Sequence, residues 1–213
     1  MQRLRLKFRR GNELKFLSHL DMMRLWERAF RRAGMPPAHS EGFAPHPHIS
    51  LAAPLPVGVI GDAELMDVFF PQHIPQDEFL RKIQPQLPAG IEISEVRDIS
   101  VSAPSLQSLV RFAEYTVEVE SCKDRQEIEA ALEAMLSAGK FFWHHSRDTG
   151  ERYYDLRSLI DNLWLIDMRD GICSIGMRLR CDASGSGRPE QVTRALGFAE
   201  LPRLIRRTQL ILA

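Results

Sequence analysis

The sequence is poor in cysteine, which limits the kinds of site it can build. Only three cysteines occur in 213 residues, and no two of them form a CxxC pair: Cys122, Cys173 and Cys181. This pattern argues against a disulfide framework and against zinc–cysteine or iron–sulfur sites. Scattered thiols are typical of a reducing compartment. We therefore expect a cytoplasmic protein with no tightly bound cofactor and no metal.

The sequence also lacks long apolar runs and net charge. No apolar run approaches the length that crosses a bilayer, and the first ten residues, MQRLRLKFRR, lack the apolar region of a signal peptide. The formal net charge is zero, which excludes a global field that attracts nucleic acid or membranes. Residues 1–32, however, contain ten Lys or Arg and three acidic residues, so charge-driven binding has to be local.

Hydrophobic periodicity predicts an α+β protein, since 44% of the residues are hydrophobic and their spacing alternates between strand and helix periods. In residues 3–10, leucine and phenylalanine alternate with Arg3, Arg5, Lys7 and Arg9. We expect a strand with one buried face and one basic, exposed face. Further strands are predicted over residues 48–55, 63–70 and 90–101, with an irregularity near Glu95, and helices over residues 18–33 and 75–87.

The same order of elements repeats in the second half. Strands are predicted over residues 112–120, 140–145, 163–168, 172–181 and 204–212, with helices over 124–138 and 189–197. Asp170-Gly171 predicts a tight hairpin, residues 148–151 a turn, and residues 155–161 stay ambiguous. The sequence thus predicts two tandem ferredoxin-like (βαββαβ) domains with antiparallel sheets, residues 1–101 and 109–213, joined by a linker.

The most distinctive segment is the helix predicted after Ser18. Ser18 is a good N-cap, and Gly34 followed by two prolines ends the helix. Its apolar arc contains Met22, Met23, Trp26, Ala29, Phe30 and Ala33; the opposite arc contains Arg24, Arg28, Arg31 and Arg32. Guanidinium groups suit phosphate contacts in RNA. The alternative is a solvated face with Asp21–Arg24 and Glu27–Arg31 ion pairs.

A loop rich in glycine, proline and histidine follows this helix. His19, His46 and His48 are the candidates for acid–base chemistry on RNA, while a metal site formed by them with His39 lacks a cysteine or acidic partner. Phe43 could stack on a base or fill the core of its own domain. In the basic C-terminal stretch, Arg188 and Arg207 are further candidates for nucleic-acid binding.

Several segments together resemble a known family. They are FLSHLD at residues 16–21, Arg28, residues 32–34, SEGFAPHP at residues 40–47 and PLPVG at residues 54–58, with weaker similarity at residues 155–157, 188–189 and 206–208. These segments resemble the radical-SAM-linked protein family, DUF2344, whose function is unknown. The resemblance implies a radical SAM protein as partner, fused or separately encoded. This chain lacks the CxxxCxxC motif of radical SAM enzymes.

These observations lead to one expected function and two alternatives. We expect a non-catalytic RNA-binding or adaptor module that works with a radical SAM enzyme, in RNA modification or processing. The first alternative is an RNA-cleaving or RNA-modifying enzyme that uses the loop histidines. The second is a purely protein-binding partner of the radical SAM protein.

Overall fold

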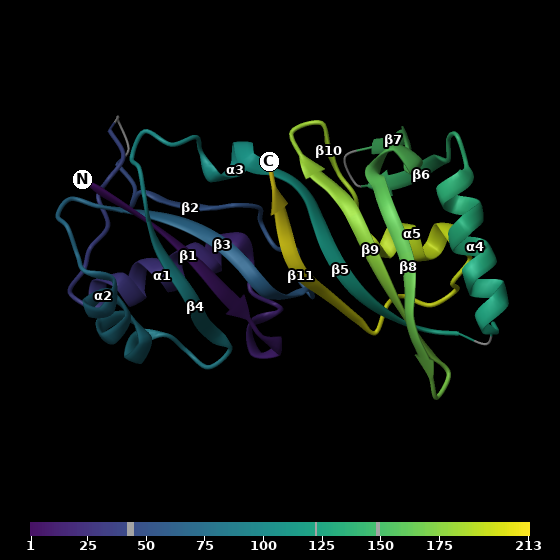
Figure 1. Ribbon diagram of the computed structural model, residues 1–213, viewed down its shortest axis with the longest axis horizontal. Helices are drawn as coiled ribbons and strands as arrows, with labels where there is room; N and C mark the ends of the chain where they lie inside the picture. Colours follow the sequence, from purple (N-terminus) through teal and green to yellow (C-terminus); the bar gives the residue numbers. More distant parts are fainter. Residues whose placement is uncertain (42–44, 122, 148–149) are drawn as a thin grey trace. The chain divides into compact units, whose positions relative to one another are not determined.

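The chain forms two compact units in its computed structural model, which describes residues 1–41, 45–121, 123–147 and 150–213. The first unit comprises Met1–Val110 with Ala213, and the second comprises Arg111–Leu212. Both combine helices with antiparallel strands (Figure 1), which confirms the α+β class. Within the described residues, no helix is both long and apolar enough to cross a membrane.

In the first unit, the strands run in the order β2–β3–β1–β4, and each neighbouring pair is antiparallel. Ser94 falls at a register shift between β1 and β4, near the irregularity that the sequence predicts. The elements are β1 Gln2–Arg10, a 3₁₀ turn Asn12–Leu14, α1 His19–Arg32, β2 Ile49–Leu51, β3 Ile60–Phe70, α2 Gln76–Ile83, a 3₁₀ turn Gln84–Gln86, β4 Ile91–Ile99 and α3 Leu106–Leu109.

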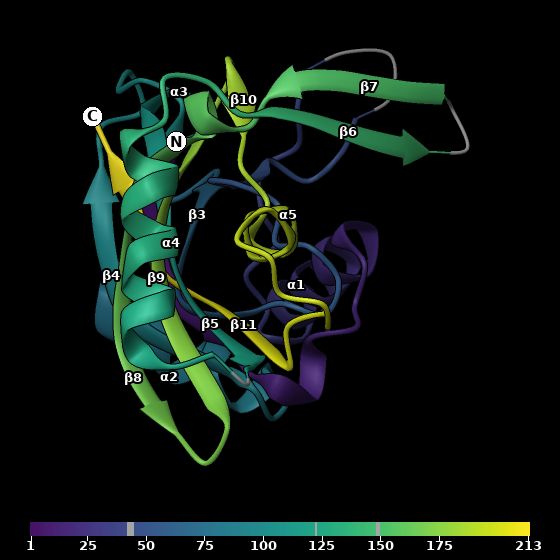
Figure 2. The same ribbon diagram turned by 90° about the vertical axis from the view of Figure 1, so that its right-hand side faces the viewer.

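In the second unit, β9 pairs with β5 on one edge and with β8 and β10 on the other, while β11 neighbours β5. A separate two-stranded ribbon, β6–β7, lies crosswise to β8 and β9 (Figure 2). The elements are β5 Val110–Glu120, α4 Arg125–Ser137, β6 Phe142–Arg147, β7 Gly150–Asp155, a 3₁₀ turn Arg157–Leu159, β8 Ile160–Arg169, β9 Ile172–Asp182, β10 Gly185–Ser186, α5 Pro189–Ala195 and β11 Leu204–Leu212.

Helix α1 is placed by its ends and by its apolar face. The Ser18 side chain accepts from the backbone N–H of Asp21, and Gly34 adopts a φ of 69°, which ends the helix as the sequence predicts. One core cluster contains side chains from α1, α2 and one face of β1, so both helices cover the same face of the sheet. Its α1 and α2 members are Met22, Trp26, Ala29, Phe30, Phe79 and Ile83.

The structure corrects the predicted secondary structure in three places. The strand expected over residues 48–55 is only Ile49–Leu51, because Pro54 and Pro56 lack the N–H that a ladder needs. The expected linker ends in the short helix α3, where Ser105 accepts from the N–H of Ser108. Strand β7 was not predicted, and it pairs with β6 rather than with the main sheet.

Candidate nucleic-acid interface

The four arginines of α1 are all exposed, on the side opposite the buried face that contains Trp26. We call Arg24, Arg28, Arg31 and Arg32 the arginine face. Residues three and four apart in a helix lie on one side, so the side chains of Arg24, Arg28 and Arg31 follow one another along α1. The side chain of Arg24 is 66% exposed.

Two of these guanidinium groups have partners, and both contacts are weak or exposed. Arg24 lies 3.6 Å from the Asp21 carboxylate, and Arg32 donates to the carbonyl of Gln86 at 2.8 Å. The expected Glu27–Arg31 pair does not form. Among the residues that the structure describes, Arg28 and Arg31 have no hydrogen bond or ion pair through their side chains. Their five donors each are therefore available to an anion.

The basic face predicted for β1 is wrong for its first half. The Arg3 guanidinium is 3% exposed and lies 2.6 Å from Oδ2 of Asp67 on β3, which is itself buried. Arg5 donates to Oδ1 of the same carboxylate at 2.8 Å. Lys7 and Arg9 stay exposed, as expected, although Arg9 lies 3.6 Å from Glu92. Asp67 thus removes two guanidinium groups from any binding surface.

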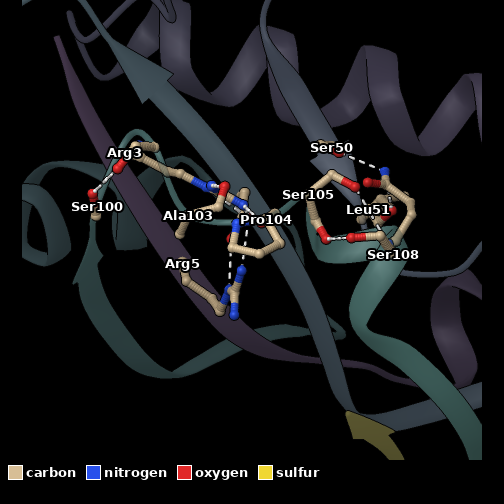
Figure 3. Close-up of polar contacts among 12 residues, drawn as sticks. Arg3, Arg5, Ser50, Leu51, Ser100, Ala103, Pro104, Ser105 and Ser108 are labelled. Atoms are coloured by element: carbon tan, nitrogen blue, oxygen red, sulfur yellow. Dashed lines mark hydrogen bonds and ion pairs between the residues drawn. The ribbon is translucent and has the colours of Figure 1, made fainter. Parts of the chain in front are cut away.

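Arg3 also holds the segment that follows β4. Its guanidinium donates to the carbonyls of Ala103 and Pro104 at 2.7 and 2.8 Å (Figure 3). Nearby, Gln107 of α3 donates to the carbonyl of Leu51 at 2.8 Å. These bonds attach residues 103–107 to the sheet of the first unit, so the role of Arg3 is structural.

Arg10 fixes the segment that leads into α1. Its guanidinium is buried and donates to the carbonyls of Leu14, Lys15 and Leu17 at 2.9 to 3.1 Å. Beside it lies a small cavity with room for about one water molecule. The cavity is lined by Phe8, Arg10, His19, Met22, Leu51, Ala53, Leu55 and Glu64.

The structure separates the candidate histidines. His19 lines the cavity beside Phe8, whereas His48 stacks on Phe69, with ring centroids 3.8 Å apart, and Phe69 pairs with Arg3. Five residues of extended strand separate Arg3 from Phe8, about 17 Å. His19 and His48 therefore lie near different ends of β1, and the acid–base role of His19 with His46 or His48 stays a prediction.

The loop histidines bond within their own loop. Nδ1 of His46 lies 2.9 Å from Oγ of Ser40. The backbone of His39 forms an isolated antiparallel β-bridge with that of Pro47. Burial, with charge from His46 and Arg3, lowers the pKa of His48, which favours its neutral form. The described residues contain no group of three His, Cys, Asp or Glu placed to hold a metal ion. Phe43 lies outside the described residues.

Of the two C-terminal candidates, only one is accessible. Arg188 is exposed at the N-cap of α5, while Arg207 on β11 is 1% exposed. A buried guanidinium cannot contact a phosphate backbone without leaving the core, so Arg207 is excluded from the interface.

Cys173 is also buried, which raises the pKa of its thiol to about 11 and keeps it protonated at neutral pH.

Sequence reasoning missed an exposed apolar group at the start of α1. Phe16, Leu20 and Val57 are 74%, 65% and 59% exposed. We call these three residues the apolar end. The sequence contained a signal, since Leu20 precedes Arg24 by one turn and so falls on the polar arc, where an aliphatic residue has no core to fill.

A comparison with protein families matches residues 3–189 to the DUF2344 family, described as an uncharacterized protein conserved in bacteria. The chain belongs to the DUF2344 family. No curated protein matches it significantly.

Some solved structures are similar to this DUF2344 chain in fold. A chain of a Cbf5–Nop10–Gar1 complex shares 9% identity at a TM-score of 0.52, over 98% of this chain and 48% of that one. A chain of an archaeal box H/ACA sRNP Nop10–Cbf5 complex shares 10% identity at a TM-score of 0.49, over 99% and 48%. The chain thus spans about half the length of the structures it matches, and at such identities the likeness concerns the fold alone.

Proposed function

We propose that the chain is a non-catalytic RNA-binding or adaptor module that contacts RNA phosphates through the arginine face. The observation that supports this proposal is that Arg28 and Arg31 are exposed on α1 and have no partner among the described residues. Free guanidinium groups in a row suit a phosphate backbone, because each presents a planar set of donors. Arg24 and Arg32 would exchange weak contacts for phosphates.

The same proposal includes a radical SAM enzyme as partner, the cytoplasm as location and a ferredoxin-like fold for each unit. The resemblance to radical-SAM-linked proteins supports a radical SAM enzyme as the protein that this module serves, and scattered thiols support the cytoplasm. The strand orders β2–β3–β1–β4 and β8–β9–β5–β11 support a ferredoxin-like arrangement in each unit. Co-purification of the chain with its radical SAM partner, with and without RNA, would test the adaptor role.

RNA binding itself is tested by salt dependence. Fluorescence anisotropy with short labelled RNAs should show an affinity that falls as salt rises. The slope of log K against log salt concentration should be about −0.7 for each phosphate neutralised. Changing Arg24, Arg28 and Arg31 to Glu should make this slope less steep by about 2, and should weaken the binding of all RNA sequences alike. No measurable affinity of the parent at low salt would contradict the proposal and leave the protein-adaptor alternative.

A matched control separates the arginine face from overall charge. Arg125, Arg169 and Arg203 are exposed on the second unit, and their change to Glu alters the net charge by the same amount. This control should keep the parent's salt slope. Equal losses in both triple variants would mean that RNA responds only to net charge.

A further inference from the structure

The arginine face continues into the apolar end. Leu20 lies one turn before Arg24 on α1, so the two side chains follow one another on one side of the helix. From Leu20 to Arg31 the helix extends about 16 Å. The backbone N–H of Gly58 donates to the carbonyl of Lys15 at 2.7 Å, which holds the loop of Val57 beside the segment of Phe16.

Phe16 is the most exposed member of this apolar end. The ammonium of Lys15 lies 5.1 Å from the centre of its ring. A ligand that covers an exposed phenyl ring gains free energy, because an aromatic face favours removal from water. The cation beside the ring makes an anionic ligand favourable at this position.

We propose that Phe16 stacks on an unpaired base of single-stranded RNA, while the phosphates on either side contact Lys15 and the arginine face. This inference rests on the proposed function and specifies its substrate class. Stacking requires a base that is not enclosed in a duplex. Aromatic side chains beside a cationic track are the usual means of holding single strands.

Charge and ring chemistry together favour RNA over a peptide for this surface. The cationic groups of Lys15, Arg28 and Arg31 call for an anion, which an acidic peptide could also supply. The exposed ring of Phe16 favours stacking on a planar group that lies at a fixed distance from that anion. Every nucleotide has both groups, whereas an acidic peptide has them only in particular sequences.

The test compares single-stranded and paired RNA on the whole chain. Anisotropy is measured with a labelled oligouridine and with a blunt duplex of equal length, for the parent, Phe16→Ala and Phe16→Tyr. Loss of the ring should weaken single-strand binding about tenfold, with duplex binding and the salt slope unchanged. Phe16→Tyr keeps an aromatic face and should retain the parent's affinity. Leu201→Ala, an exposed apolar residue of the second unit, is the matched control.

The outcomes distinguish this inference from the proposed function. If Phe16→Ala binds oligouridine as the parent does, or weakens both RNAs equally, base stacking is wrong. The proposed function survives that result when the arginine triple variant still loses its salt slope. If the parent binds neither RNA at low salt, both proposals fail, and the surface belongs to a protein partner.

Discussion

The first arginines of β1 and those of α1 look alike in the sequence and differ in the structure. Arg3 and Arg5 alternate with apolar residues on a strand, and Arg28 and Arg31 lie opposite an apolar arc on a helix. Arg3 is nearly inaccessible, however, while Arg28 and Arg31 are exposed and unpaired among the described residues. A basic stripe thus serves packing in one place and remains open to a ligand in the other.

The difference is made by one carboxylate that is distant in the sequence. Asp67 lies on β3, directly across from Arg5, and accepts from both Arg3 and Arg5. Among the described residues, no carboxylate pairs with Arg28 or Arg31 on α1, and Asp21 reaches only Arg24 among the arginines of this helix. Basic residues therefore report a binding surface only where the fold supplies no acid for them.

The largest expected effect is the loss of this carboxylate. Asp67→Ala leaves two guanidinium groups without their anion, one of them buried, and should lower the free energy of unfolding by about 3–5 kcal/mol. Urea denaturation of the parent and the variant measures the difference. A loss below about 1 kcal/mol would mean that Arg3 regains water when Asp67 is removed, and that the comparison overstates its burial.

A compensated variant sharpens this result. Replacing Arg3 and Arg5 by Met together with Asp67→Leu removes the charges at once and should cost less stability than Asp67→Ala alone. The remaining loss would measure the bonds from Arg3 to the carbonyls of Ala103 and Pro104.

An intermediate effect is expected for the pH dependence of stability. Burial, His46 and Arg3 lower the pKa of His48 below its ordinary value of 6.5. Between the lowered pKa and 6.5 the unfolded chain binds more protons, so stability is full above pH 6.5 and falls as the pH falls through that range. His48→Phe keeps the stack on Phe69 without a titrating group.

Thermal melts from pH 8 to pH 5 compare the two proteins. The variant should lose less stability than the parent on acidification, and the difference should appear only below about pH 6.5, the ordinary histidine value. Parallel curves over the whole range would show that His48 does not titrate differently on folding.

Local sequence signals predicted α1 well, whereas features that depend on residues distant in the sequence could not be predicted. Ser18, Gly34 and the arc of Trp26 and Phe30 are readable because caps and periodicity act over a few residues. The burial of Arg3 depends on Asp67, which is distant in sequence, and the burial of Arg207 depends on its place in a sheet. The exposure of Phe16 was not predicted, since this residue precedes the helix and helical periodicity does not place its side chain.

The smallest expected effect is on the stability of the arginine face itself. Arg28→Ala should change the free energy of unfolding by less than about 0.5 kcal/mol, because the side chain is exposed and has no partner among the described residues. Alanine also has the higher helix propensity, which opposes any loss. Urea denaturation beside Asp67→Ala gives the contrast directly. A loss above about 1 kcal/mol would show that Arg28 packs against the protein, and the arginine face would then be structural like Arg3 rather than open to RNA.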